Sequence, residues 1–500
     1  MTKTLTETAP PEVSPRSIGP HLVAAGSLYA LTNFGLKGFN FLMVPIVSRF
    51  LRPADYGIVA LVDTIAGPIG MLCGLGTASA LRRLYFDYTD EARSRSYVGT
   101  ALRFVVLTTI AIVALSSYAG PRILNSIAGN LAISVSPLLA LAIATNGLGQ
   151  VQQTQLTIFQ VQNQPRTYAA TSILSCLAGA IAIAGLVIWL RMGAFGVLAS
   201  RLVGTVLAVA IGTYITRRFL SAPWNWPSLG EHVRFGLPLA MFELVNLGLV
   251  FANRLILQHY RPLDEVGIYA IAYQFGSLMM LVTTSLGQVW SPLFFETARS
   301  GNVSQLRKAS SALMVGLVAI ASAGVLIAQP AIHVILDRRY AAAAPLVPLI
   351  LGAYLINSFY YLFEVVAMQH KRSALILALT AFACALNIGL NLWCVPLWGA
   401  TGAAYATLAA YIVQAFVMYL AVRPRAKTFY SRSTMIAALT IFTGALVVSE
   451  LPLPSHVRPF ALLAALAVTM GLLWPLGLNR IHRVITAAIA LRSQSPVCDE

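Results

Sequence analysis

Charged side chains are scarce in this chain. Asp, Glu, Lys and Arg make up 10% of its 500 residues, whereas apolar residues make up 58%. A soluble domain carries about 25% charged residues, so this composition excludes a water-soluble globule. Apolar runs of roughly 20 residues recur between Leu22 and Leu478, and a helix of that length spans a hydrocarbon core of about 30 Å. The sequence therefore predicts an all-α polytopic membrane protein.

Cysteine pairs, large loops and nucleotide-binding motifs are also missing. The five cysteines stand far apart without a Cys-x-x-Cys pair, which indicates neither a disulfide framework nor a zinc site. The motifs G-x-x-x-x-G-K-[ST], H-E-x-x-H and D-x-D, typical of nucleotide hydrolysis, zinc proteolysis and nucleotide-sugar transfer, do not occur. The connections between apolar runs are too short for a catalytic domain. We therefore expect no enzyme activity, no metal and no cofactor.

The formal net charge of +17 indicates how the chain is oriented in the membrane and does not indicate nucleic-acid binding. The Lys and Arg residues are scattered over short loops instead of forming a patch. With fourteen spans and the N-terminus inside, 21 of the 34 Lys and Arg residues fall on the inner side and 8 on the outer side. Positive charge is retained in cytoplasmic loops, so we expect both termini in the cytoplasm.

The second half of the chain repeats the first. The phrase R-P-A-D-Y-G-I at residues 52–58 returns with one insertion as R-P-L-D-E-V-G-I at residues 261–268, and G-A-F-G at 193–196 returns as G-A-T-G at 399–402. Because six spans return the chain to its starting side, the halves have the same orientation. This parallel repeat about an axis along the membrane normal is a plan used by transporters with alternating access.

The repeat divides the chain into two six-helix lobes and two further helices. We expect a cytoplasmic tail at residues 1–21, lobes at 22–218 and 219–428, additional helices 13 and 14 within 429–480, and a second tail at 481–500. The expected spans are 22–47, 57–80, 98–119, 131–156, 168–190, 194–216, 232–258, 266–291, 309–330, 342–367, 373–395, 399–421, 433–449 and 459–478.

Charged side chains recur on single faces of the predicted spans. A charge at bilayer depth costs at least about 2.5 kcal/mol on insertion scales, so it is expected to face a cavity or a partner. In the first span Lys37 shares a face with two asparagines, and in the seventh Glu243 shares one with Arg254. These stripes predict a hydrated cavity. The open alternative is an ion pair, Lys37 with Glu243 or with Asp63, that only fixes helix packing.

The fourth span carries a row of amides that includes Asn146, Gln150 and Gln153. Amides donate and accept hydrogen bonds at once, which suits sugar hydroxyls that approach in several orientations. Hydrogen bonding between helices is the open alternative. Carboxylates inside the spans could take up a proton when desolvation raises their pKa. The candidates for ion coupling are Asp63, Glu243 and Glu364.

The loop signatures resemble a known family. Residues 44–57, followed by the glycine-rich stretch 67–76, look like the opening of bacterial polysaccharide flippases, and residues 235–238 and 266–269 are similar to the start of their second half. These flippases are the Wzx-type members of the multidrug/oligosaccharidyl-lipid/polysaccharide exporter superfamily. Many members have Asp where this chain has Asn253, so a coupling role is not carried over to that position.

The resemblance implies a substrate. It predicts translocation of undecaprenyl-pyrophosphate-linked oligosaccharide from the cytoplasmic to the outer leaflet of the bacterial inner membrane, for assembly of O-antigen, capsule or exopolysaccharide. Such a headgroup needs fixed positive charge for the diphosphate and hydrogen-bonding groups for the sugars. The candidates for the diphosphate are Lys37, Arg254, Arg201, Arg49 and Arg52. The candidates for the sugars are Asn33, Asn40, Asn246, Asn146, Gln150, Gln153 and Asn357.

The expected partners are the polyprenyl-pyrophosphate-linked oligosaccharide and membrane lipid, with the polysaccharide polymerase and other assembly proteins as further candidates; nucleic acid is not expected. The additional helices 13 and 14 are implied to guide the lipid tail. Two alternatives stay open. A drug/cation antiporter of the same superfamily would favour acidic residues in its lumen, and a non-transporting scaffold of the assembly machinery would carry no substrate.

Overall fold

The computed structural model describes residues 15–88, 90–127, 135–370, 372–451 and 458–476. Within these ranges the chain forms helices and turns and contains no strand. The predicted tail at 481–500 lies outside the described residues, and the predicted tail at 1–21 overlaps the first helix, which begins at Pro15. The all-α fold of a polytopic membrane protein is thereby confirmed.

The first half contains α1 (Pro15–Phe50), α2 (Pro53–Gly74), α3 (Thr77–Leu84), η1 (Tyr85–Asp87), α4 (Glu91–Ile127), α5 (Val135–Val161), α6 (Pro165–Ile183), the π-helical turn η2 (Ala184–Trp189) and α7 (Gly193–Leu220). The second half contains α8 (Trp226–Tyr260), α9 (Leu263–Gly276), α10 (Leu278–Arg299), α11 (Val303–Ile335), the 3₁₀ helix η3 (Arg338–Ala343), α12 (Leu346–Gln369), α13 (Ser373–Phe429), α14 (Arg432–Glu450) and α15 (Arg458–Leu476).

Residues 131–134 and 477–478 of the predicted spans lie outside the described residues. Elsewhere the predicted spans fall on these helices with three local differences. The predicted span 57–80 is broken between α2 and α3, where Leu75 and Gly76 adopt positive φ angles of 43° and 72°. Its counterpart 266–291 is broken between α9 and α10. The two spans expected at 373–395 and 399–421 form the single element α13, which kinks at Gly399. Ten of the described helical segments are long and apolar enough to cross a membrane, so the count of fourteen crossings stays a prediction.

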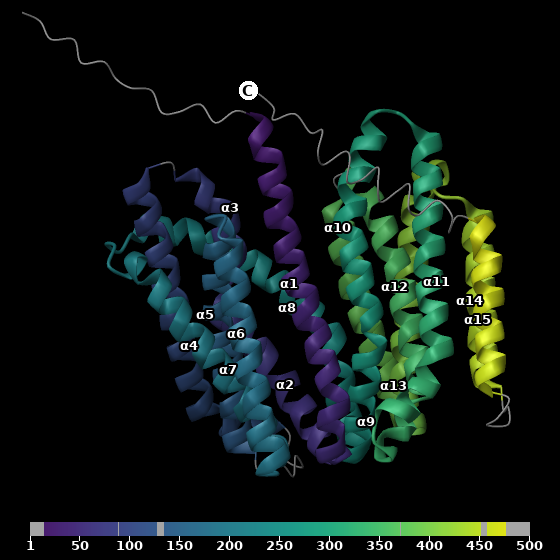
Figure 1. Cartoon of the computed structure of the whole chain (residues 1–500), viewed down its shortest axis with the longest axis horizontal. Coiled ribbons are helices and arrows are strands. Elements are labelled where there is room, and N and C mark those ends of the chain that lie inside the picture. Colours follow the sequence, from purple (N-terminus) through teal and green to yellow (C-terminus); the bar gives the residue numbers. More distant parts are fainter. Residues whose placement is uncertain (1–14, 89, 128–134, 371, 452–457, 477–500) are drawn as a thin grey trace, which may run out of the picture.

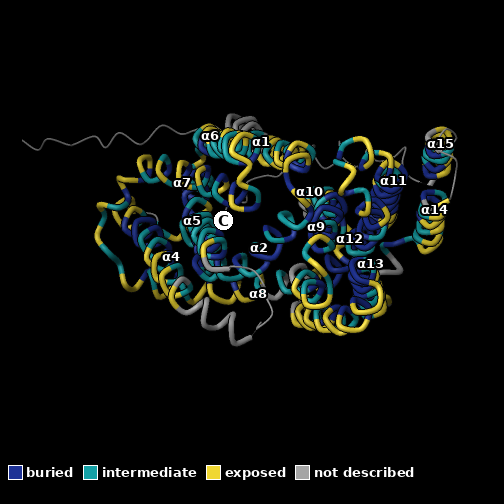
Figure 2. Tube along the Cα trace, turned by 90° about the horizontal axis from the view of Figure 1, so that it is seen from below, coloured by how far each residue is buried: buried dark blue, intermediate teal, exposed yellow. Residues whose placement is uncertain are grey.

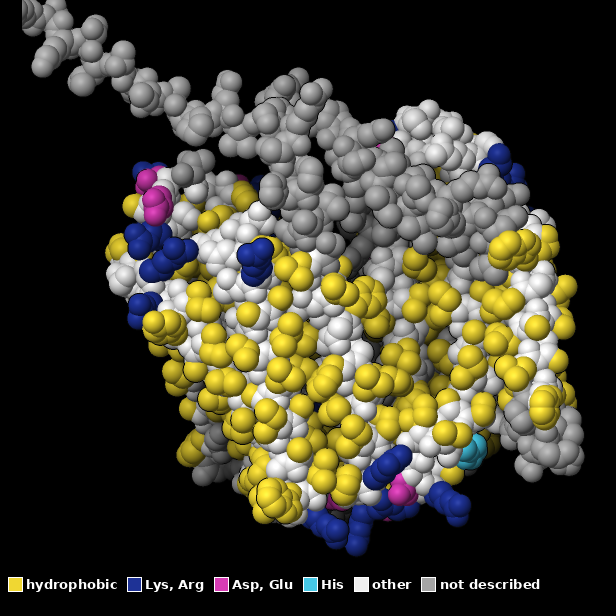
Figure 3. All heavy atoms as spheres, viewed as in Figure 1, with side chains coloured by type: hydrophobic (Ala, Val, Ile, Leu, Met, Phe, Trp, Pro, Cys, Tyr) yellow, Lys and Arg dark blue, Asp and Glu magenta, His cyan; other side chains and the backbone are white. Residues whose placement is uncertain are grey.

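Apolar side chains cover the middle of the bundle and charged ones gather toward its ends (Figure 3). The end at which α1 begins and α3 ends, drawn at the top of Figure 1, is called the inner end here, and the opposite one the outer end. These names follow the predicted orientation. A lipid-facing belt between two charged rims is what a bilayer requires of a helical bundle.

Two lobes stand side by side (Figures 1 and 2). Helices α1 to α7 form the N-terminal lobe, and α9 to α13 form the C-terminal lobe, against which α14 and α15 pack through α11. Helix α8 links the lobes, because its first turns contact α3 and α4 and its later turns contact α13 and α9. Apart from α8, the main packing between the lobes is that of α2 against α9.

The crossing of α2 and α9 is symmetric in the way the repeat predicts. Gly57 of α2 and Gly267 of α9 meet there. A Cβ atom on Gly57 would lie 2.2 Å from the carbonyl oxygen of Leu263, and one on Gly267 would lie 1.8 Å from that of Pro53. Leu263 and Pro53 are the first residues of their helices. Only glycine permits this approach, so equivalent residues make equivalent contacts across the repeat axis.

The second pair of repeated glycines also shares one conformation. Gly193 and Gly399 have φ angles of 55° and 56°, in the region that favours glycine. Each glycine lies beside a carboxylate from the first turn of α2 or α9. Asp55 of α2 lies against Gly193, and Glu265 of α9 accepts a hydrogen bond from the N–H of Ala400, the residue after Gly399, at 2.6 Å. Asp55 and Glu265 are themselves equivalent in the repeat. These matched turns support two homologous halves.

At the outer end the lobes are joined by polar contacts. The N–H of Ala54 donates to the Asp264 carboxylate at 3.0 Å, and the hydroxyl of Tyr56 donates to Oε1 of Gln274 at 2.9 Å. Both contacts connect residues more than 200 positions apart in the sequence. They tie the start of α2 to α9 next to the glycine crossing, so the outer end is closed in this structure.

Helix η3 adds a second outer contact. The guanidinium of Arg339 donates to the carbonyl oxygen of Arg49 at 2.9 Å, and the hydroxyl of Tyr340 donates to that of Leu51 at 3.2 Å. These carbonyls belong to the end of α1 and would otherwise lack a partner. Asp337 orients Arg339 at 2.8 Å, and the side chain and backbone N–H of Arg339 lower the pKa of that carboxyl. The end of α1 is therefore capped by the opposite lobe.

A neutral polar network holds α8 against α13 inside the C-terminal lobe. Nδ2 of Asn253 donates to the hydroxyls of Tyr269 at 3.1 Å and Thr407 at 2.8 Å, and Nδ2 of Asn391 donates to Oδ1 of Asn253 at 2.8 Å. All four side chains are buried. A buried polar group destabilises a fold unless it is paired, so the network fixes the relative position of the two helices.

We expect Asn391→Leu to lower the free energy of unfolding by about 1 to 2 kcal/mol, because it leaves Oδ1 of Asn253 buried without its donor. Denaturant unfolding of the purified protein in detergent measures this. Asn357→Leu is the matched control, since Asn357 is half-buried in α12 and makes no hydrogen bond with another described residue. Equal stability of the two variants would contradict a structural role for the network.

Candidate functional site

A cavity of ≈ 800 Å³ lies inside the N-terminal lobe. Helices α1, α2, α5, α6 and α7 line it, and Gln274 of α9 reaches it from the other lobe. Ligand pockets in proteins measure about 300 to 1,000 Å³, so this hollow has the size of a binding site. Within a membrane-spanning bundle a hollow with polar walls is a strong indication of a substrate pathway.

The amides of α5 form one wall of this cavity. Asn146, Gln150 and Gln153 line it as the sequence predicts, and Gln152 joins them. The side-chain amides of the three glutamines make no hydrogen bond with any other described residue, whereas Nδ2 of Asn146 donates to the carbonyl oxygen of Ala142 at 2.9 Å. The glutamines are therefore available to a ligand and do not hydrogen-bond between helices.

Helices α1 and α6 form the opposite wall. Asn33 and Asn40 of α1 line the cavity. The hydroxyl of Tyr168 on α6 donates to Oδ1 of Asn33 at 2.9 Å, which fixes that amide, while Cys176 lies 3.9 Å from Oδ1 of Asn40. Tyr168 also meets Tyr29 edge-on, with 5.0 Å between ring centroids. The first wall thus offers free amides and the second offers oriented ones.

The cavity contains one cation from the predicted set, Arg201 of α7. Its Nη1 lies 2.6 Å from Oδ2 of Asp63 on α2, and 46% of the Arg201 side chain and 31% of the Asp63 side chain stay accessible. The sequence interpretation had paired Asp63 with Lys37, or Lys37 with Glu243. That interpretation is corrected here for Asp63, whose partner is Arg201, because α2 packs against α7 in this lobe.

Arg254 lies at the junction of the two lobes. Its guanidinium carbon is 5.3 Å from the centre of the Tyr273 ring, a cation–π contact. Tyr56, like Arg201, lines the cavity, and its hydroxyl donates to Oε1 of Gln274, the residue that follows Tyr273 in α9. The polar contact between α2 and α9 therefore stands between the two arginines along this series of contacts, with Arg201 of α7 at the cavity and Arg254 of α8 at Tyr273.

Lys37 is exposed and stands at the edge of the cavity wall without lining it. It lies one turn before Phe41, whose ring meets that of Phe275 with 4.8 Å between centroids. This places Lys37 on the side of α1 that turns toward the C-terminal lobe. Arg49 and Arg52 lie elsewhere, exposed at the outer turn between α1 and α2.

The remaining predicted residues are spread over the C-terminal lobe and α8. Glu364 is buried and lines a second cavity of ≈ 640 Å³ between α10, α11 and α12, together with Trp290 and Tyr361. Asn357 is half-buried in α12 and Glu243 is exposed on α8. Asn246 lies in α8, but its side chain is outside the described part of the chain.

The C-terminal lobe is filled with tyrosines where the N-terminal lobe is hollow. Tyr273 of α9 corresponds to Asp63 of α2 at the offset of 210 residues that relates the repeated glycines. Its ring packs against Tyr354 at 5.8 Å between centroids, and Tyr354 packs against Tyr411 at 6.1 Å. All three rings are buried. The sequence interpretation did not identify this cluster, because tyrosines scattered over three spans give no periodic signal.

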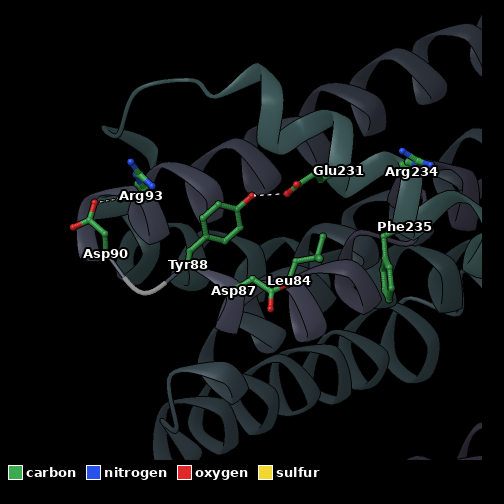
Figure 4. A pocket seen from close by; sticks show the side chains of 8 residues that line it. All are labelled: Leu84, Asp87, Tyr88, Asp90, Arg93, Glu231, Arg234 and Phe235. Carbon is green, nitrogen blue, oxygen red and sulfur yellow. Dashed lines mark hydrogen bonds between the residues drawn. The ribbon is translucent and has the colours of Figure 1, made fainter.

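A shallower hollow of ≈ 620 Å³ lies at the inner end, where the start of α8 meets the N-terminal lobe (Figure 4). Tyr88 points toward Glu231 there, and its hydroxyl donates to Oε2 at 3.0 Å. Burial, and then the Glu231 carboxylate, raises the pKa of Tyr88 to about 12, so the hydroxyl keeps its proton at neutral pH. Carboxylates and arginines alternate around this hollow, which suits a contact between chain segments better than an anion site.

Comparison with known proteins identifies a family. A family model described as polysaccharide biosynthesis protein matches residues 22–298. The succinoglycan biosynthesis transport protein ExoT of Rhizobium meliloti (strain 1021) is 24% identical over 326 residues, which cover 64% of this chain and 63% of the relative. The match thus spans less than two thirds of that relative.

Solved structures of two transport proteins share the fold. The lipid II flippase MurJ in an inward closed conformation matches with a TM-score of 0.69 and 13% identity, over 90% of this chain and 99% of that one. An inward-facing multidrug resistance MATE family transporter of the MOP superfamily matches with a TM-score of 0.66 and 16% identity, over 78% and 94%.

These relatives are transporters and flippases by name, so the expectation that the protein is not an enzyme is confirmed. The matched family model covers more than half of the chain. The chain therefore belongs to the polysaccharide biosynthesis protein family, as its resemblance to the flippases of the multidrug/oligosaccharidyl-lipid/polysaccharide exporter superfamily predicted.

Proposed function

We propose that this protein translocates undecaprenyl-pyrophosphate-linked oligosaccharide from the cytoplasmic to the outer leaflet of the bacterial inner membrane, with both termini in the cytoplasm. The observation that carries the proposal is the cavity of the N-terminal lobe, which combines free glutamine amides with Arg201 inside membrane-spanning helices. Amides suit sugar hydroxyls, and an arginine binds phosphate oxygens bidentately.

The charges support a division of the substrate between two regions. Three cations would attract the diphosphate. Arg201 lies in the cavity, Arg254 lies at the lobe junction, and Lys37 lies on the side of α1 that faces this junction. The sugars would then extend along the amides of α5. The polyprenyl tail would stay in lipid, since an apolar chain gains nothing from entering a polar hollow.

The closed outer end supports loading from the inner side. Alternating access would require the lobes to separate at the crossing of Gly57 and Gly267 and to close at the inner end, as rigid bodies that rock about their interface. Helix α8 contacts both lobes, so it would bend or tilt during this motion. The polysaccharide polymerase and other assembly proteins are proposed partners on the outer side.

A drug/cation antiporter is the second candidate. The C-terminal cavity favours it, because Glu364 with Trp290 and Tyr361 offers a carboxylate beside aromatic rings, which suits a lipophilic cation. The two candidates differ in the sign of the cargo and in the lobe that binds it.

Vesicles that contain the purified protein distinguish these functions. We expect lipid-linked oligosaccharide to become accessible to an externally added sugar-cleaving enzyme at least about tenfold faster than in protein-free vesicles. A tenfold rate requires the protein to lower the barrier to crossing the bilayer by only about 1.4 kcal/mol. Uptake of organic cations without movement of lipid-linked sugar would identify the antiporter. If neither cargo moved, the proposal would be contradicted and the non-transporting scaffold would remain as the alternative.

A further inference from the structure

The ion pair between Arg201 and Asp63 stands well inside the lobe. Asp63 is ten residues from the start of α2 and Arg201 eight from the start of α7, which places both roughly 12 to 15 Å from the outer end. The two side chains are nevertheless 46% and 31% accessible, and Arg201 lines the cavity. A ligand in the cavity can therefore reach the guanidinium of the pair.

The pair is not required to build a lobe of this fold. At the offsets of the repeat, 210 residues for α2 and 206 for α7, the equivalent positions in the C-terminal lobe are Tyr273 and Thr407. Both are neutral and buried, and Thr407 belongs to the network of Asn253. The same architecture thus forms with uncharged residues at both positions, so helix packing in this fold does not itself require the two charges.

The contact leaves most of the guanidinium available. Arginine has five N–H donors, and Asp63 accepts from Nη1 alone, through one oxygen. A diphosphate carries more negative charge and more acceptor oxygens than a carboxylate, and it binds a guanidinium bidentately. A phosphoryl group that entered the cavity could thus replace Asp63 on Arg201 without leaving the cation unpaired.

We propose that Asp63 is an internal counter-ion of Arg201 that the phosphoryl group of the substrate displaces. The carboxylate neutralises Arg201 while the cavity is empty, and it competes with the phosphoryl group when the cavity is loaded. This competition keeps affinity low enough for release on the other side. The identity of the ligand as a lipid diphosphate rests on the proposed function, whereas the exchange of anions on Arg201 does not.

The test measures binding of inorganic pyrophosphate to the full-length protein in lipid nanodiscs. We expect Asp63→Asn, which removes the charge and keeps the shape, to bind pyrophosphate about tenfold more tightly than the unmodified protein, a shift typical of one coupled site. Arg201→Gln should bind at least tenfold more weakly, and the double variant should show no gain. A purely structural pair would give weaker binding in both single variants, so the sign of the Asp63→Asn effect decides.

Glu231→Gln is the matched control, because it removes one negative charge from the inner end outside the cavity; it should leave the affinity unchanged. Unchanged or weaker binding by a folded Asp63→Asn protein would overturn the inference. If Asp63→Asn fails to fold, Asp63→Ala replaces it, and undiminished pyrophosphate binding by Arg201→Gln overturns the inference by itself.

The outcomes also separate the inference from the proposed function. Tighter pyrophosphate binding by Asp63→Asn without any movement of lipid-linked oligosaccharide would refute the function and support the exchange. Movement of lipid-linked oligosaccharide with an affinity that is indifferent to Asp63 would refute the exchange and support the function.

Discussion

Replacing both Lys37 and Arg254 by alanine should abolish polysaccharide export while the protein still inserts and folds. Lys37 and Arg254 occupy the sides of α1 and α8 that turn toward the lobe junction. Loss of a charge partner from a desolvated contact costs about 2 to 5 kcal/mol. Two such losses should reduce transport by at least about a thousandfold, which polysaccharide measured at the cell surface would report.

The matched control is the Arg49→Ala, Arg52→Ala double variant. It removes the same charge from the outer turn, where both side chains are exposed, and it should keep most of the export. Arg254→Lys should restore part of it, since lysine supplies the charge without the bidentate geometry. Full export by a well-expressed Lys37→Ala, Arg254→Ala protein would contradict the assignment of these two residues to phosphate binding and leave Arg201 as the phosphate-binding cation.

A covalent link across the outer end should stop transport completely and reversibly. Ala54 and Asp264 touch through a 3.0 Å hydrogen bond, so we expect cysteines at these positions to be joined by a disulfide or by a short bis-thiol reagent with a reducible linker. The bond would hold the lobes together at the glycine crossing and prevent the outer end from opening. We expect transport in vesicles to fall to the protein-free level after oxidation and to return after reduction.

The experiment needs a background in which the five native cysteines are replaced by alanine. Each single cysteine variant, treated with the same oxidant, is the control and should transport normally. Undiminished transport by a fully cross-linked protein would mean that the lobes do not part at this contact, and alternating access would then require a different hinge.

The sequence predicted the helices and the repeat well because both leave periodic signals. Apolar runs mark each span, and the phrase at residues 52–58 returns at 261–268 because the α2–α9 crossing demands glycine at Gly57 and Gly267. The breaks after Leu75 and before Leu278 were not predicted, since both lie inside the expected spans 57–80 and 266–291 and neither a proline nor a charged residue stands at the break. Hydropathy reports solvent preference and says nothing about the path of the backbone.

The sequence predicted which face of each helix carries the polar residues of the candidate site, but not which helices pack against these faces. Periodicity placed Asn33, Gln150 and Gln153 on polar stripes, and these residues do line one cavity. It could not identify Arg201 as the partner of Asp63, because the pair joins residues 138 positions apart. One sequence read alone contains the orientation of each helix face and no information about which faces meet.

The plugging of one lobe by tyrosines bears on how such a protein evolves. Two homologous halves share one architecture, and here the second half holds the cluster of Tyr273, Tyr354 and Tyr411 where the first half has its cavity beside Asp63 and Arg201. On the proposed function, differences in cargo between related transporters would map to the first half of the chain. An exchange of residues 22–218 between two such proteins would then transfer cargo preference in one step.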